Sequence, residues 1–262
     1  MMIEALLLVV AALQDHRVAA DEGQIFPLDM ALNSADDQYD GCSKEMEKKV
    51  RNTYLDRELK SNSDFKKVWE IGQMNIDRNF KDKELKKDHK IALYAYTYPG
   101  NENTSSIFNT FNEDTRNGRK KYTANTYNWY SLHFLLTDAI HILKKTQTEC
   151  DTTFRGTKVA FKGQVFTSVR FGSFTSSSTK KYVAENFGQK SCFKIQTCKG
   201  ARIARYSKDH DEEEVLIPPY EVFKITEIKT RNKQNKLWCD TVFVLNSTGV
   251  WSDLNCTLFR RP

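Results

Sequence analysis

The sequence lacks the short spacings that hold structural zinc. Its six cysteines and five histidines form no Cys-x-x-Cys or His-x-x-x-His pair, so we expect no bound metal. It also lacks a long basic block, because its 40 Lys and Arg are interspersed with 34 Asp and Glu. The formal charge of +6 therefore favours weak attraction to anionic surfaces or ligands, and we expect no nucleic-acid partner.

Internal repeats, low-complexity tracts and linkers are also lacking, so nothing divides the 262 residues into separate units. A composition of 39% hydrophobic and 12% aromatic residues is that of a folded globular chain large enough for one sizeable core or two small ones. We expect a monomer.

Long hydrophobic runs are rare, which excludes a membrane-spanning protein. The apolar run at residues 5–13 is too short to cross a bilayer. Small residues, Val18, Ala19 and Ala20, follow it, so residues 1–20 are predicted to be a signal peptide, with a buried N-terminal helix as the alternative. The sequence ends at Pro262 without an apolar tail, so we expect no GPI-anchor signal and a soluble, secreted, extracellular product.

The six cysteines form an even set, which behind a signal peptide indicates disulfides. Fifteen pairings are possible for six cysteines. Three Asn-x-Ser/Thr sequons, at Asn103, Asn246 and Asn255, are candidate glycosylation sites. The cysteines are Cys42, Cys150, Cys192, Cys198, Cys239 and Cys256.

The first part of the chain, about residues 28–148, is mainly helical in pattern. Apolar residues recur at roughly helical spacing over residues 43–76, which predicts two amphipathic helices. Residues 105–116 and 129–145 predict two more. The apolar and aromatic residues 90–98 stop at a proline and predict a strand.

The second part, about residues 149–257, has the pattern of short strands, with one helix predicted at residues 178–187. This order of elements predicts an α+β fold in which helices pack on sheets. The predicted strands are residues 152–156, 164–171, 192–198, 201–206, 215–217, 221–228, 236–244 and 250–254.

Three short motifs follow one another in this second part. Arg155 and Gly156 stand on a predicted strand, and Ser176, Ser177 and Ser178 follow another. Next, Glu212, Glu213 and Glu214 precede the apolar run Val215-Leu216-Ile217. If all three glutamates are in a strand, Glu212 and Glu214 share one face, because side chains alternate. The alternative is a solvated acidic loop before a buried strand.

The arginine, the serine run and the Glu-x-Glu, in this order, resemble the R-S-E signature of the arginine-specific mono-ADP-ribosyltransferases of the secreted and cell-surface vertebrate type. Further stretches resemble landmarks of that family, so the resemblance covers roughly residues 28–257. It implies a single catalytic domain, residues 21–262, in which a helical part packs on a β-sandwich core of ADP-ribosyltransferase type. These stretches are residues 36–39, 92–97, 132–136 and 214–218.

The resemblance also assigns roles to four residues. Arg155 is implied to contact the phosphates of NAD, which a guanidinium fork suits, and Ser176 to order the site beside the catalytic glutamate. Glu214 is implied to hold a ribose hydroxyl and stabilise positive charge on the sugar. Glu212 is implied to bind the acceptor arginine and accept its proton. From the residues alone, Arg155 fits a surface ion pair equally well, and Ser176 fits a helix N-cap.

Weaker matches imply nucleotide contacts for Tyr96, Ser173 and Ser207. Tyr96 also fits core packing. The resemblance places residues 207–211 in an exposed loop that meets the acceptor protein, with His210 solvated.

The resemblance selects two disulfides, Cys42–Cys256 and Cys150–Cys198. The other two cysteines, Cys192 and Cys239, lie outside the family's common pattern, and we predict that they pair across adjacent strands.

The activity implied is transfer of ADP-ribose from NAD, a substrate here, to arginine side chains of extracellular proteins, with release of nicotinamide. Two alternatives stay open. One is an NAD glycohydrolase, against which Glu212 argues. The other is a catalytically silent binding protein of the same fold, against which the complete motif argues.

Overall fold

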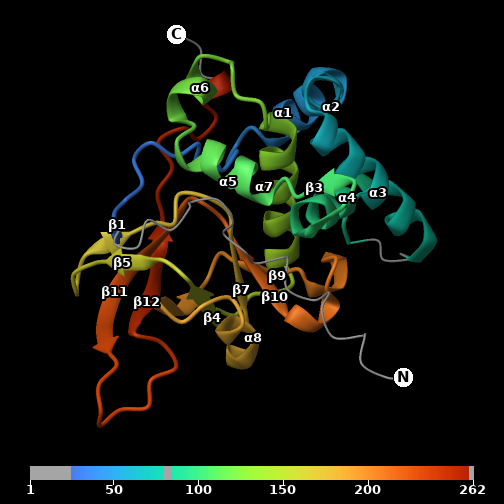
Figure 1. Cartoon of the computed structure of the whole chain (residues 1–262). Helices are drawn as coiled ribbons and strands as arrows, with labels where there is room; N and C mark the ends of the chain where they lie inside the picture. The colour runs from blue at the N-terminus through green and yellow to red at the C-terminus, as the bar shows by residue number, and fades with distance from the viewer. Residues whose placement is uncertain (1–24, 80–83, 260–262) are drawn as a thin grey trace, which may run out of the picture.

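The computed structural model describes residues 25–79 and 84–259. Most helices come first along the chain and most strands follow (Figure 1), and the predicted α+β class is confirmed. The predicted signal peptide lies outside the described residues.

The helical elements are α1 (Ser43–Lys49), the π-helical η1 (Val50–Tyr54), α2 (Leu55–Ser61), α3 (Ser63–Asn79), α4 (Lys87–Thr97), α5 (Phe108–Arg116), α6 (Arg119–Thr123), α7 (Tyr130–Lys144), α8 (Lys181–Glu185) and the single 3₁₀ turns η2 (Ala204–Tyr206), η3 (His210–Glu212) and η4 (Thr257–Phe259). The strands are β1 (Ile25–Pro27), β2 (Gly100–Asn101), β3 (Thr104–Ser105), β4 (Asp151–Thr157), β5 (Ala160–Lys162), β6 (Ser168–Val169), β7 (Thr175–Ser178), β8 (Ser191–Thr197), β9 (Ala201–Arg202), β10 (Glu214–Ile217), β11 (Glu221–Thr230) and β12 (Thr241–Val250).

The largest sheet has the strand order β6-β11-β12-β8-β4-β7-β10-β9. A single residue pair, Phe154 with Ser178, joins β4 to β7, whereas β4 and β8 pair along their whole length. The sheet therefore consists of two parts that meet at this pair. We call them the larger ladder, formed by β6, β11, β12, β8 and β4, and the smaller ladder, formed by β7, β10 and β9. The three motifs lie on both sides of the junction, because β4 carries the arginine while β7 and β10 carry the serines and the last glutamate.

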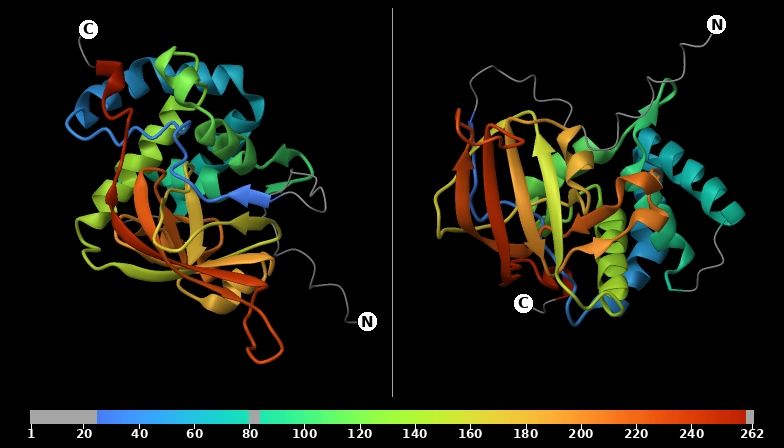
Figure 2. Two further views of the ribbon diagram at one scale, coloured as in Figure 1. Left: turned by 90° about the vertical axis from the view of Figure 1, so that its left-hand side faces the viewer. Right: turned by 90° about the horizontal axis from the view of Figure 1, so that it is seen from below.

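Two apolar cores lie on opposite faces of β10. Leu216 belongs to the core of the helical part, together with Phe174, whereas the next residue, Ile217, belongs to the core among the longer strands. Figure 2 shows the helices gathered on one side of the molecule and the larger ladder on the other. Burial of both faces explains why β10 is an uninterrupted apolar run.

The long helix α7 is buried on nearly all sides, and a buried carboxylate satisfies its N-terminus. Glu58, from α2, accepts hydrogen bonds from the backbone amides of Tyr130 and Ser131 at 2.9 and 3.0 Å. These amides have no partner inside the helix, and the positive end of the helix dipole favours an acceptor there. Burial raises the pKa of Glu58 to about 7.

A buried ion pair ties the beginning of the described chain to its end. Asp36 lies 2.6 Å from Nη1 of Arg170, and both side chains are almost completely buried. The same carboxylate accepts hydrogen bonds from the backbone amides of Asp253 and Leu254 at 3.2 and 3.0 Å. Arg170 precedes the serine-bearing strand, so this contact holds the approach to β7.

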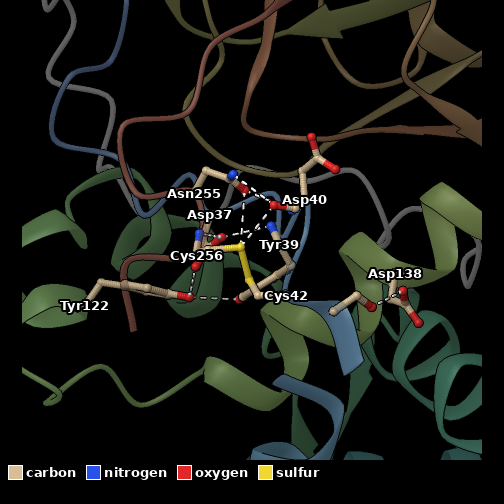
Figure 3. Close-up of a disulfide and its surroundings, with 9 residues drawn as sticks. Asp37, Tyr39, Asp40, Cys42, Tyr122, Asp138, Asn255 and Cys256 are labelled. Carbon is tan, nitrogen blue, oxygen red and sulfur yellow. Dashed lines mark hydrogen bonds between the residues drawn. A yellow bond between two sulfur atoms is a disulfide. The ribbon is translucent and has the colours of Figure 1, made fainter. Parts of the chain in front are cut away.

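The neighbouring residue, Asp37, closes the same junction. Its carboxylate accepts hydrogen bonds from the Tyr122 hydroxyl at 2.8 Å and from the backbone amide of Cys256 at 2.9 Å. Figure 3 shows these groups packed around the Cys42–Cys256 disulfide. A bridge that closes so long a loop contributes about 5 kcal/mol in chain-entropy estimates.

All three disulfides join the cysteine pairs named above. They are Cys42–Cys256, Cys150–Cys198 and Cys192–Cys239. Cys192 lies on β8, but Cys239 stands in the loop before β12. The third bridge therefore joins a strand to a loop, and the expected strand-to-strand geometry is wrong.

The largest error in the predicted elements concerns residues 90–98, which form most of the helix α4. Residues 89–97 are all buried, so the segment shows no alternation of apolar and polar faces. Without that alternation, a short apolar run does not distinguish a strand from a helix. The helix α4 also packs closely against α3, where a Cβ on Gly72 would stand only 3.2 Å from Ile91.

Several boundaries also differ from the prediction. The serine run is itself a strand, and the following helix is confined to Lys181–Glu185. Only Ser168–Val169 of residues 164–171 is paired, and the segment 201–206 ends as a 3₁₀ turn. The last strand, β12, occupies Thr241–Val250, so the separate strand predicted at residues 250–254 does not form. These strands take their bounds from partners distant in sequence, which local patterns do not reveal.

Candidate active site

The strand β10 places Glu214 beside the serine strand. Its register with β7 sets Glu214 opposite Ser178 and Leu216 opposite Ser176. Paired residues share a face and side chains alternate along a strand, so Glu214 and Ser176 lie on the same face. That face is turned toward the helical core, to which Leu216 belongs.

Arg155 enters the site from β4. Its Nη1 donates a hydrogen bond to the backbone oxygen of Ser176 at 2.9 Å, and its side chain is only partly buried. Its charge acts to lower the pKa of Glu214. The structure therefore brings together the three residues that the motif predicts, across the junction of the two ladders.

The residue after the motif arginine has to be glycine. A Cβ on Gly156 would stand 2.2 Å from the backbone oxygen of Ala184 in α8 and 2.5 Å from that of Gly188. Real side chains do not approach backbone atoms so closely, so any other residue would displace β4 from α8. The Arg-Gly pair thus combines a functional side chain with a steric requirement.

The Glu214 carboxylate is 2% exposed and accepts a hydrogen bond from the Ser207 hydroxyl at 3.1 Å. Burial raises its pKa to about 7, although Ser176, Ser207 and Arg155 each act to lower it. Desolvation opposes the ionised form, and the hydrogen bonds and the cation favour it. Near neutral pH the group is close to its titration point.

The backbone that carries Glu212 is a turn, whereas the sequence predicted a strand. Residues 210–212 form the turn η3, and Glu213 adopts a left-handed backbone with φ +48°. Strand alternation therefore does not explain why Glu212 and Glu214 lie together, because only Glu214 of the three glutamates is in a strand. Glu212 and Glu214 are nevertheless both buried, whereas Glu213 is exposed.

Two features mark Glu212 as a group prepared for a cationic ligand. Its Oε2 is buried and has no hydrogen-bond partner among the described residues. Burial, Glu214 and Asp209 together raise its pKa to about 8. A buried carboxylate without a donor is costly, and a guanidinium would supply both charge and donors.

The Ser176 hydroxyl is also buried and without a well-formed hydrogen bond among the described residues, although it lies near enough to act on the pKa of Glu214. Ser176 is inside β7, so the N-cap interpretation is wrong. Its free hydroxyl fits a site that completes its hydrogen bonds with a bound molecule.

The three weaker candidates for nucleotide contacts each have an internal partner. The Tyr96 hydroxyl donates to the backbone oxygen of Phe174 at 3.1 Å, Ser173 accepts from Arg116 at 3.0 Å, and Ser207 binds Glu214. Tyr96 is 1% exposed and Ser173 and Ser207 are each 2% exposed. All three side chains are therefore buried, and Tyr96 and Ser207 lie near Glu214.

Two neighbouring residues make contacts to which the motif assigned no role. The Ser178 hydroxyl donates to the backbone oxygen of Glu212 at 2.7 Å, and Thr97 accepts from the backbone amide of Lys208 at 2.9 Å. Ser178 belongs to the serine run that the motif already identified. Thr97 stands directly after Tyr96, but no local pattern connects it with residue 208.

The arginine from β4, the serine from β7 and the two glutamates from η3 and β10 therefore form one constellation at the junction of the two ladders. The family model for NAD:arginine ADP-ribosyltransferase matches residues 28–242. The chain belongs to this family. Its arginine, serine and glutamates, to which the resemblance assigns roles, meet in space.

Relatives of this family are similar over most of the chain. NAD(P)(+)–arginine ADP-ribosyltransferase 2 of Gallus gallus is 36% identical over 239 residues, 89% of this chain and 73% of the relative. The erythroblast NAD(P)(+)–arginine ADP-ribosyltransferase of Gallus gallus is 40% identical over 207 residues, 76% of this chain and 67% of the relative.

Solved structures of the family share the fold. The crystal structure of the eucaryotic mono-ADP-ribosyltransferase ART2.2 matches with a TM-score of 0.72 and 32% identity, covering 90% of this chain and all of that one. A variant of ART2.2 solved in complex with NAD matches with a TM-score of 0.73 and 31% identity over the same share of each chain.

Two further properties concern only the described residues. Within 25–79 and 84–259, no helix is both long enough and apolar enough to cross a membrane. In the same part of the ADP-ribosyltransferase chain, no three His, Cys, Asp or Glu side chains gather in a way that could hold a metal ion.

Proposed function

We propose that this protein transfers ADP-ribose from NAD to arginine side chains of proteins and releases nicotinamide. The observation that carries the proposal is the buried pair Glu212 and Glu214, with a partnerless carboxylate oxygen on Glu212 and a guanidinium from β4 beside it. Membership of the NAD:arginine ADP-ribosyltransferase family supports the same conclusion.

The residues present fit NAD. Arg155 is partly exposed and presents a planar fork that suits phosphate oxygens. The unsatisfied Ser176 hydroxyl provides a further polar contact at the same point. We propose that Tyr96, Ser173 and Ser207, whose side chains are buried, shape the nucleotide site. The ART2.2 variant of similar fold was solved with NAD bound.

Bond cleavage requires stabilisation of positive charge. The bond between nicotinamide and ribose breaks with its electron pair leaving on nicotinamide, so the sugar becomes oxocarbenium-like. The buried Glu214 carboxylate, fixed by Ser207, stabilises that charge by electrostatics that need no reorganisation. It also accepts a hydrogen bond from a ribose hydroxyl.

Transfer then requires a nucleophile. An arginine guanidinium is protonated at neutral pH and attacks only when one nitrogen is oriented and its proton is removed. Glu212 binds the guanidinium, directs a nitrogen at the anomeric carbon and takes the proton as the new carbon–nitrogen bond forms. Water attacks the same centre when no arginine is present, which yields free ADP-ribose.

We also propose that the protein is secreted as a monomer, with residues 1–20 removed as a signal peptide and arginine-bearing extracellular proteins as its acceptors. The three disulfides support an oxidising compartment. Among the sequons, Asn103 is exposed in the turn between β2 and β3, whereas Asn246 and Asn255 are partly buried. Asn103 is therefore the best candidate for glycosylation.

Incubation of the purified protein with NAD labelled in the adenosine part tests the function. Label on an arginine analogue supports the transferase, whereas free labelled ADP-ribose alone, with or without the analogue, supports a glycohydrolase. Intact NAD in both reactions would indicate a binding protein without turnover and would contradict the proposal.

A further inference from the structure

A threonine at the end of α4 holds the segment that carries Glu212. Thr97 is the last residue of this helix and is 3% exposed. Its hydroxyl bonds back to the carbonyl oxygens of Leu93 and Tyr94 at 3.1 and 3.2 Å. With its proton directed into the helix, Oγ1 presents a lone pair to the backbone amide of Lys208 at 2.9 Å.

We define residues 208–213 as the acceptor segment. It is fixed at its start by Thr97 and near its end by Ser178, which donates to the backbone oxygen of Glu212 at 2.7 Å. Lys208, His210, Asp211 and Glu213 expose their side chains, so apart from Asp209 only Glu212 points inward. The two hydroxyls therefore hold a short, highly charged segment from opposite ends.

Glu214 is held independently of Thr97. It belongs to β10, whose backbone pairs with β7 and β9. Its side-chain partner, Ser207, is anchored by its own turn, since its amide donates to the oxygens of Ile203 and Ala204 at 3.1 and 3.2 Å. The Ser207 hydroxyl also accepts a hydrogen bond from the Asp209 amide at 3.3 Å, but the strand pairing of β10 does not involve Thr97. Loss of the Thr97 contact would thus loosen Glu212 and leave the backbone of Glu214 in place.

We propose that Thr97 is a positioning residue that favours transfer to arginine over hydrolysis of NAD. This inference rests on the proposed function, because Glu214 serves both reactions while Glu212 serves only transfer. Thr97 acts through the backbone of the acceptor segment, and a small displacement of an orienting group lowers the rate of a directed attack strongly. Attack by water needs no such orientation of a guanidinium.

Three variants test the proposal against a merely structural role. Thr97→Val removes the acceptor oxygen at nearly constant volume, and Thr97→Ser restores it. Thr115→Val is the matched control, because Thr115 is also a fully buried helical threonine that bonds back to a carbonyl, Phe111 O at 2.7 Å, and to a neighbour, the Tyr127 hydroxyl at 2.7 Å. It lies in α5, outside the machinery described above.

The measurement is the ratio of labelled acceptor to free ADP-ribose, with KM and kcat for an arginine analogue and KM for NAD. We expect Thr97→Val to lower the ratio about tenfold, with a higher KM for the analogue and an unchanged KM for NAD. Thr97→Ser should keep the parental ratio. Thr115→Val should lower the melting temperature without moving the ratio.

Each other outcome counts against the proposal. An unchanged ratio in Thr97→Val, a proportional loss of both activities, or the same shift in Thr115→Val would overturn it while leaving the proposed function intact. Thr97→Ala is prepared in parallel, and failure of both non-hydroxyl variants to fold would assign Thr97 a structural role instead. If the parental protein itself transfers nothing to the analogue, the proposed function fails first.

Discussion

At the scale of single residues, two glutamates two positions apart differ in what holds them. Glu214 is fixed by a strand and a serine hydroxyl, whereas Glu212 stands on a turn with one carboxylate oxygen unpaired. This difference suits two roles, since one group must be rigid before nicotinamide leaves and the other must receive an incoming cation.

Replacement of each glutamate should separate these roles. Glu212→Gln keeps the shape but removes the charge, so transfer to an arginine analogue should fall by at least about 10²-fold while some NAD hydrolysis remains. Glu214→Ala should abolish both reactions. The products of labelled NAD distinguish the cases, and parental rates of transfer in Glu212→Gln would show that another group binds the acceptor.

The pH dependence of transfer follows from the raised pKa of Glu212, about 8. Below this pH the free enzyme holds a proton on the group, and binding of a guanidinium has to displace it. We expect kcat/KM for an arginine analogue to rise with pH and level off above about 8. The profile of Glu212→Gln should lose the part of this limb near pH 8 and keep the part near pH 7, because Glu214, with a pKa of about 7, must also be ionised. An identical limb near pH 8 in both proteins would assign it to a different group.

At the scale of elements, the site depends on contacts between segments that are short and individually weak. The strands β7 and β10 are four residues each, and a single residue pair joins β7 to β4. Packing of α8 on β4 therefore matters for the position of Arg155, and Gly156 is where the two elements come closest.

A methyl group at this contact should be poorly tolerated. Gly156→Ala introduces a Cβ at 2.2 and 2.5 Å from two backbone oxygens, which forces β4 and α8 apart at a cost of about 1–3 kcal/mol. The melting temperature should fall, and KM for NAD should rise as Arg155 shifts. Gly249→Ala controls for the loss of a glycine as such, because a Cβ there meets nothing within 4 Å, although its φ of +133° carries its own strain. An increase in KM for NAD of equal size in both variants would contradict the steric account.

The predicted elements were most reliable where one face of a segment is exposed. The amphipathic helices of residues 43–76 and the helix α5 were expected because polar residues mark their solvent side. The helix α4 was missed because it is buried all round and its apolar run is short, whereas the largely buried α7 was expected because its apolar run is too long for a typical strand. The Thr97 contact of α4 was missed for the same reason, since a residue with no exposed face gives no pattern.

At the scale of the whole molecule, two cores meet at β10, and the segments near the two ends of the described chain are tied together. Asp36 is central to that tie, because one carboxylate binds Arg170 and two backbone amides of the C-terminal segment. Removal of one partner leaves the other charge buried and unpaired, which costs far more than loss of a surface pair.

Stability measurements on matched aspartates test this difference. Asp36→Ala should lower the free energy of unfolding by about 3–5 kcal/mol. Asp56→Ala, which breaks the exposed pair of Asp56 with Lys60, should change it far less, because solvent screens the pair. Denaturant unfolding with intact disulfides gives both values, and similar losses in the two variants would show that the buried pair is not a main contributor.

The sequence by itself determined the fold class, the family and the four motif residues. Those features depend on residue types in a fixed order, which can be recognised without knowledge of contacts. Only the tertiary structure decided that Glu212 stands on a turn, that Ser176 lies inside a strand and that Thr97 holds the acceptor segment. These are consequences of pairing and packing between residues far apart in the chain, and a single sequence carries no local sign of them.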